Sequence, residues 1–300
     1  MPSRLPSGLI VNADDLGIHP SINAGILSAY RSGILTSCTM LMTTPYLEQT
    51  VREYVRAQAP PMGIHLCLTM GRAIAPLEHV TALVDESGNL KLSARRLVFS
   101  SFERRNDGLL LQIRREFEAQ LSLAYDYGLR PTHADSHEHV HMNPAIFAML
   151  EDVLPRYGIQ RIRYVRERFL SAALGRDLPS IARRLNPAKW LVLRWRSSRL
   201  KPRLMTSDEF FGVLYSGVVS KEVLRLIIAR SAPDIATELC LHPGFPAPKG
   251  DASYQQRNYN EFISSAARQI EHDILVDQEI ATLVREKGLI LRSFDGRAKH

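Results

Sequence analysis

Short apolar runs rich in β-branched residues alternate with segments of helical periodicity along nearly the whole chain of 300 residues. We predict strands at 7–13, 36–44, 62–69, just before the stretch 133–141, and at 161–165, 210–216, 237–242 and 288–294, with helices at 20–33, 45–58, 108–127, 144–157, 220–231 and 256–287. Such alternation indicates parallel strands joined by crossover helices. The chain has no GxGxxG motif, so we predict an α/β protein with a TIM-like (β/α) barrel of about seven parallel strands.

Two stretches interrupt this alternation, and we expect both to be insertions in a single domain spanning residues 1–300. Residues 71–107 have little periodicity and are predicted to be an excursion or lid. Residues 167–206 are basic and contain both tryptophans, Trp190 and Trp195. The domain prediction is therefore one barrel with two long insertions.

Composition and charge narrow the class of protein. No stretch approaches the roughly 18 apolar residues that a membrane span needs, so we expect a cytoplasmic protein. Cys38, Cys67 and Cys240 lie far apart in apolar segments and are predicted to be reduced core thiols. The net charge of +7 is concentrated in residues 161–203, which hold 13 Arg or Lys against two acidic residues. This local excess, without a recognisable nucleic-acid-binding module, argues against a nucleic acid partner.

Polar side chains gather at the ends of four predicted strands. They are Asp14 and Asp15, then His65, then His133, Asp135, His137, Glu138, His139 and His141, and finally His242. In a barrel of parallel strands these ends meet at one mouth, where carboxylate and imidazole groups suit a divalent metal. Asp14 and Asp15 can both face that mouth only if the chain turns out of the strand. One could then bind the metal while its neighbour stays ionised as a base.

Each residue also has a purely structural interpretation. His65 could be a hydrogen-bonded core histidine, His242 a loop residue, and the two aspartates a charge pair at a helix N-terminus. For the stretch 133–141, we expect the strand to stop near Ser136, because a longer strand would bury five polar residues on one face. A single metal site explains all four strand ends together, whereas the structural interpretations require four coincidences.

The motifs VNADDLG, TSCTMLM, GIHLCLTMG, PTHADSHEHVHMNP, IRYVRE and ELCLHPGF, in this order, resemble the YdjC-like carbohydrate deacetylases. This group includes chitooligosaccharide deacetylase and the hopanoid-associated deacetylases. The resemblance covers residues 9–294 and implies a distorted β/α barrel that removes acetyl from an N-acetylated amino sugar with one divalent metal, Mg²⁺ or Zn²⁺. It also implies roles for six residues: Asp15, His65 and His137 as metal ligands, Asp14 as general base, His242 as general acid, and Arg163 as the partner that keeps Asp14 ionised.

The resemblance leaves the substrate and the partners open. The sugar could be part of an oligosaccharide or of a glycolipid. The basic segment 183–203 could pack one apolar edge on the barrel, or it could contact the inner membrane surface, since Trp and Leu among Arg are typical of interfacial helices. Whether two copies form a homodimer is also open.

Two other functions use the same fold. One is a metal-dependent hydrolase of another bond, such as a phosphoester, which predicts a second metal or a phosphate-binding glycine loop. The other is a non-catalytic sugar-binding protein, which is expected to lack part of the catalytic set. The sequence has neither phosphate signature, and Asp14, Asp15, His65, His137 and His242 are all present.

Overall fold

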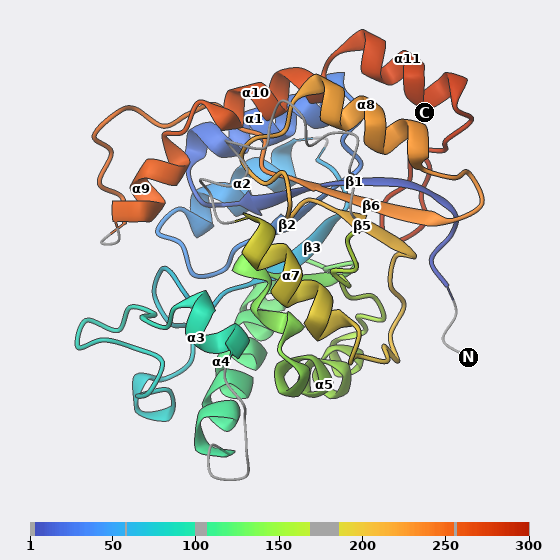
Figure 1. Ribbon diagram of the computed structural model, residues 1–300. Helices are drawn as coiled ribbons and strands as arrows, with labels where there is room; N and C mark the ends of the chain where they lie inside the picture. The colour runs from blue at the N-terminus through green and yellow to red at the C-terminus, as the bar shows by residue number, and fades with distance from the viewer. Residues whose placement is uncertain (1–3, 58, 100–106, 169–185, 255–256, 300) are drawn as a thin grey trace.

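Six parallel strands form the centre of the protein in a computed structural model, which describes residues 4–57, 59–99, 107–168, 186–254 and 257–299 (Figure 1). The strands are β1 (Gly8–Leu16), β2 (Ser37–Met40), β3 (Met62–Leu66), β4 (Ala134–Ser136), β5 (Glu209–Phe211) and β6 (Ala236–Leu241), and their spatial order is β4-β3-β2-β1-β6-β5. All the paired strands are parallel and every strand residue is buried. This confirms the predicted α/β class, because parallel strands buried on both faces need covering helices.

The sheet is a curled half-barrel of six strands, so the prediction of a barrel with about seven strands was wrong in its count. The predicted strand 161–165 makes only isolated bridges, from Ile162 to β4 and from Arg161 to Met205. The predicted strand 288–294 likewise makes single bridges at Leu291 and Arg292. Both segments run beside the sheet, but their pairing is too short to form strands.

Helices cover the strands on both sides (Figure 1). In chain order they are α1 (Pro20–Ser32), α2 (Leu47–Arg56), α3 (Ala94–Phe99), α4 (Asp107–Asp126), α5 (Pro144–Val153), α7 (Asn186–Ser197), α8 (Lys221–Arg230), α9 (Arg257–Ile263), α10 (Ala267–Leu275) and α11 (Gln278–Glu286). Capping residues mark the N-termini of two of these helices: Asn143 caps α5 just before Pro144, and Ser220 caps α8. Short 3₁₀ turns lie at Leu77–His79, His137–Met142 and Leu154–Tyr157.

Two predicted elements are shorter than expected. The helix predicted at 256–287 is divided into α9, α10 and α11, because the chain leaves the helical conformation after Ile263 and again at Val276. The strand predicted at 210–216 is only Glu209–Phe211, and Gly212 has a φ of +149° directly after it. Amphipathic periodicity continued across these breaks, so the sequence pattern did not reveal them.

The two predicted insertions differ in how they meet the sheet. The described part of 71–107 packs on α4, where the buried Glu116 accepts hydrogen bonds from the backbone N–H groups of Ile74 and Ala75. Its role as a lid stays a prediction. The second insertion contributes α7, while residues 169–185 lie outside the described residues.

The three cysteines are buried and free, as predicted. Among the described residues, every helix is too short or too polar to cross a membrane.

Gly25 in α1 provides a test of how the helix meets the loop after β6. A Cβ at Gly25 would lie 2.5 Å from the Cα of Gly244. We expect Gly25→Ala to lower the free energy of unfolding by about 1–3 kcal/mol, because backbone atoms must move apart. Gly108→Ala in α4 is the matched control, since nothing lies within 4 Å of its added Cβ. Urea denaturation that finds the two variants equally stable would contradict this close contact.

Candidate metal and catalytic site

A break in the regular backbone at the end of β1 lets adjacent aspartates reach the same region. Asp15 has a φ of 68°, and the pairing of β1 with β2 shifts register between Ala13 and Leu16. A non-glycine residue in the left-handed region costs about 1–3 kcal/mol and is concentrated at functional sites. The chain does not turn out of the strand as expected, because β1 continues to Leu16; an irregularity within the strand, at Asp15 itself, has the same effect.

Asp15, His65 and His137 converge on one point from the ends of three strands. The Oδ1 atom of Asp15 lies 3.5 Å from Nε2 of His65 and 3.1 Å from Nδ1 of His137. One donor atom from each residue lies within 4.8 Å of the others, and all three side chains are buried. His137 directly follows β4, which ends at Ser136 as predicted.

Asp135 holds the His65 ring in the orientation that this cluster requires. Nδ1 of His65 is 2.6 Å from Oδ1 of Asp135, which leaves Nε2 to face Asp15. Thr39 donates to the other oxygen of Asp135 at 3.2 Å. Metal-binding histidines are typically oriented by such a carboxylate on their second nitrogen.

The cluster fits a divalent metal by its donor chemistry. It offers one carboxylate oxygen and two imidazole nitrogens, the donor composition of a catalytic metal site, and His65 and His137 line a cavity. The second carboxylate oxygen of Asp15 accepts a hydrogen bond from the buried Arg268 at 3.0 Å, which fixes the carboxylate. Burial raises the pKa of Asp15, but hydrogen bonds from His137 and His65 and the charge of Arg268 outweigh it and hold the pKa well below its ordinary value. Asp15 is thus ionised at neutral pH, as a metal ligand would need to be.

Arg163 binds Asp14 through two hydrogen bonds. Nη1 and Nη2 of Arg163 each lie 2.7 Å from one oxygen of Asp14. The same guanidinium reaches Asp135 at 2.7 Å and Glu238 at 2.5 Å, and it is fully buried. Burial raises the pKa of Asp14, but Arg163, with His65, lowers it well below its ordinary value. Asp14 is therefore a carboxylate in the folded protein.

His242 and Asp14 line the same cavity. This cavity has a volume of about 220 Å³. A ring nitrogen of His242 is within 4.8 Å of an Asp14 oxygen. Burial lowers the pKa of His242 to about 4, although Asp15 and Asp14 oppose it. Desolvation of the ring therefore exceeds the attraction of these two acidic neighbours. The remaining lining residues are Glu138, His139, Lys189, Ser216, Asn258, Tyr259 and Phe262.

Not every polar residue at the strand ends belongs to this site. His133 stacks on Phe294 with 3.6 Å between ring centroids, and His141 contacts the Ser136 hydroxyl and the Arg163 carbonyl oxygen. These two histidines have structural contacts away from the ligand cluster. His139 lines the cavity, with a buried Nδ1 that has no hydrogen-bond partner among the described residues.

Several residues of the site were not predicted. Asp135 and Glu238 stood in predicted motifs without a role, whereas Arg268 lay in a predicted helix with no motif to mark it. Lys189 reaches the cavity from α7, far along the chain from the other site residues. Only the two-residue spacing of Asp135 and His137 gave a signal, because alternate residues of an extended chain lie on one face.

The ends of the parallel strands carry a buried Asp-His-His cluster beside a carboxylate that an arginine holds. This arrangement is typical of α/β proteins that bind a metal at the ends of their strands. Comparison with known proteins then gives the family. The family model described as YdjC-like protein matches residues 8–286, and the chain belongs to this family, as the sequence motifs indicated.

Curated relatives and a solved structure are similar to this chain over most of its length. The chain is 32% identical over 256 residues to a carbohydrate deacetylase of Geobacillus stearothermophilus, covering 84% of this chain and 87% of that protein. It is 28% identical over 289 residues to a chitooligosaccharide deacetylase of Serratia marcescens, covering 95% and 97%. A crystal structure from Enterococcus faecalis, of a protein described as a candidate for cellobiose-phosphate cleavage, matches with a TM-score of 0.70, 25% identity, and coverage of 97% and 98%.

Metal binding is expected to release a proton from His65. Burial lowers the pKa of His65, but Asp135, with Asp14 and Asp15, raises it well above its ordinary value, so the ring is protonated at neutral pH in the metal-free protein. A histidine must be neutral to bind a metal ion through its ring nitrogen. Affinity for Zn²⁺ should therefore rise about tenfold per pH unit below that pKa. Calorimetry in buffers of different ionisation enthalpy would measure the released proton, and a heat that is independent of buffer would contradict the assignment.

Proposed function

We propose that this protein is a metal-dependent carbohydrate N-deacetylase, which hydrolyses the acetamido group of an N-acetylated amino sugar. The observation that carries the proposal is the convergence of Asp15, His65 and His137 on one point, with His65, His137 and the carboxylate of Asp14 lining one cavity. Relatives named carbohydrate deacetylase and chitooligosaccharide deacetylase support the same reaction. An oligosaccharide or a glycolipid could carry the sugar.

Asp15, His65 and His137 would hold one divalent cation. Two imidazoles with one carboxylate favour Zn²⁺ over Mg²⁺, which prefers oxygen ligands, and elemental analysis distinguishes the two. When bound, such an ion acts as a Lewis acid on a carbonyl and lowers the pKa of a water molecule. Arg268 and Asp135 keep Asp15 and His65 in place for it.

Asp14 would act as the general base toward water. Its low pKa, set by Arg163, keeps it ionised, and its position on the cavity brings it to the reacting amide. His242 would protonate the departing amine. Because its pKa is about 4, it must first receive a proton, and the proton that Asp14 removes from water is the nearest source. The two side chains would thus act as a pair that moves one proton from water to the amine.

The alternative functions receive less support from the site. Among the described residues, the candidate metal clusters other than Asp15-His65-His137 both depend on Asp14. Both oxygens of Asp14 are already bound by Arg163, which gives a second ion for phosphoester hydrolysis little support. A non-catalytic sugar-binding protein is expected to lack part of the catalytic set, whereas Asp14, Asp15, His65, His137 and His242 are all present.

Asp14→Asn tests the proposed base. We expect acetate release from N-acetylglucosamine oligosaccharides to fall by about 10²–10⁴-fold, since Asn cannot accept the proton. Metal content should stay near that of the unaltered protein, whereas Asp15→Asn should lose metal. Enzymatic assay of acetate and elemental analysis provide both readouts, and full activity of Asp14→Asn would refute the mechanism.

We also propose that α7 contacts an anionic membrane surface. Leu191 and Trp195 are 61% and 46% exposed, and Arg194, Arg196 and Arg199 lie among or just beyond them. The guanidiniums of Arg196 and Arg199 lie 4.7 and 3.9 Å from the Trp195 ring, so the patch combines an aromatic surface with positive charge. Such a patch suits anionic headgroups above a shallow apolar layer. Lys189 at the start of α7 lines the catalytic cavity, which would bring that cavity close to lipid-linked sugars.

Liposome co-sedimentation tests this contact. We expect the protein to sediment with vesicles of phosphatidylcholine and phosphatidylglycerol but not with phosphatidylcholine alone, because anionic lipid supplies the attraction. A Leu191→Glu, Trp195→Glu double variant should remain in the supernatant. Val55→Glu is the control, since Val55 is 68% exposed on α2. If equal amounts of protein sediment with and without anionic vesicles, the proposed membrane contact is wrong.

A further inference from the structure

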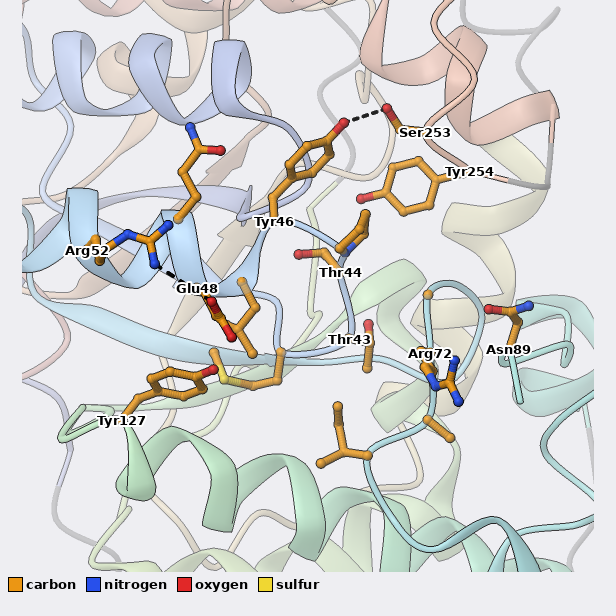
Figure 2. Close-up of a pocket in the computed structure, with 17 residues that line it drawn as sticks. Thr43, Thr44, Tyr46, Glu48, Arg52, Arg72, Asn89, Tyr127, Ser253 and Tyr254 are labelled. Atoms are coloured by element: carbon orange, nitrogen blue, oxygen red, sulfur yellow. Dashed lines mark hydrogen bonds and ion pairs between the residues drawn. The ribbon is translucent and has the colours of Figure 1, made fainter. Parts of the chain in front are cut away.

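A second and larger cavity lies apart from the metal site. It has a volume of about 690 Å³ and shares no lining residue with the catalytic cavity. Its walls come from the segment after β2, from α2, from the loop after β3 and from residues 253–254, and Figure 2 shows their side chains around it. We call it the Thr43 groove, lined among others by Thr43, Thr44, Tyr46 and Arg72. Its volume falls within the range of small-molecule sites.

Backbone contacts hold the walls of the Thr43 groove in place. The N–H of Arg72 donates to the carbonyl oxygen of Thr43 at 2.9 Å. Gly71 has a φ of +76°, and a Cβ there would lie 2.1 Å from that oxygen. Opposite, the hydroxyl groups of Tyr46 and Ser253 are 2.6 Å apart, which links the far wall (Figure 2). The groove is thus formed before any ligand binds, which lowers the entropy cost of binding.

Two threonine hydroxyls at the groove are unsatisfied. Thr43 and Thr44 are 2% and 7% exposed, and their Oγ1 atoms have no hydrogen-bond partner among the residues described. By contrast, the hydroxyl of the nearby Thr50 donates to the carbonyl oxygen of Tyr46 at 2.8 Å. Buried hydroxyl groups are nearly always paired, because an unpaired one loses its hydration without compensation. Both side chains border the cavity, so a ligand there could supply the missing partners.

The other groups on the groove select the chemistry of that ligand. The phenol rings of Tyr46, Tyr127 and Tyr254 offer apolar faces, while Arg72 and Asn89 offer donors and Glu48 an acceptor (Figure 2). A sugar ring has apolar C–H faces and hydroxyl groups that both donate and accept. Glu48 pairs with Arg52, another lining residue, at 3.7 Å. A phosphate would need donors only and would make no use of the apolar ring faces or of an acceptor such as Glu48. We propose that the Thr43 groove is a second carbohydrate site, which binds a saccharide unit away from the reacting acetamido group.

The groove is joined to the catalytic cavity by a pair of tyrosines. Tyr254 lines the groove and Tyr259 lines the catalytic cavity, with 6.3 Å between the ring centroids. Tyr259 also donates to Glu138, another residue of the catalytic cavity, at 3.2 Å. Resting on the proposed deacetylase function, the saccharide in the groove is either a distal unit of the oligosaccharide being deacetylated or a separate sugar molecule. Both share the same chemistry.

Calorimetry on the Asp14→Asn protein, which does not consume its ligand, tests the site. The probes are N-acetylglucosamine and its tetrasaccharide, β-1,4-linked. Thr44→Val and Arg72→Ala in this background should each weaken tetrasaccharide binding by about five- to thirtyfold, the loss expected for one hydrogen bond. Arg56→Ala is the control for lost charge, because Arg56 ends α2 outside the groove. Thr44→Val should also have an unchanged or higher urea midpoint, since its hydroxyl has no partner to lose in the free protein.

These measurements distinguish a distal unit of the substrate from a separate sugar molecule. They also distinguish failure of the groove proposal from failure of the deacetylase function. One tetrasaccharide per chain, bound more weakly by both variants, indicates a distal unit, whereas two tetrasaccharides per chain, one of them lost in Thr44→Val, indicate a separate sugar. Unchanged affinity in both variants would overturn the groove as a carbohydrate site. Acetate release from the disaccharide by the unaltered protein is measured independently, so a failed deacetylase function would not be mistaken for a failed groove.

Discussion

The buried guanidinium of Arg163 is the interaction on which the site depends. It meets Asp14 from β1, Asp135 from β4 and Glu238 from β6, and so ties strands from both halves of the sheet to one point. Removing one partner of such a buried pair typically costs about 3–5 kcal/mol, because the remaining charges are left without compensation. The same cation that makes the strand ends compatible with burial also keeps Asp14 ionised. Stability and reactivity are coupled here through a single side chain.

Charge balance explains how so many ionised groups can share a dry interior. In the metal-free protein, Arg163, Arg268 and a protonated His65 face the carboxylates of Asp14, Asp15 and Asp135. Glu238 is an acidic group beyond the number of positive charges. Burial raises the pKa of Glu238 to about 7, although the charge of Arg163 lowers it. The cluster is therefore close to neutral as a whole, although almost every member is charged.

The sequence predicted the parts of the fold that depend on local periodicity. The helices α1, α2, α4 and α8 lie within a few residues of their expected bounds, and the polar ends of β1, β3 and β4 meet as parallel strands require. What it could not predict were contacts set by long-range packing. Arg268 reaches Asp15 across 253 positions of the chain, and no local pattern marks it. The curl of the sheet, which leaves 161–165 with isolated bridges, likewise depends on how all the layers pack.

The left-handed backbone of Asp15 has a consequence for which amino acids this position can hold. Among residues with a side chain, mainly Asn and Asp adopt this conformation at low cost, and Gly adopts it freely. Of these three, only Asp brings a full negative charge. Glu could supply the charge but would strain the chain, whereas Gly would relax it and leave His65, His137 and Arg268 with no shared anion. The backbone conformation and the ligand chemistry together leave Asp as the one amino acid, of the twenty, that suits position 15.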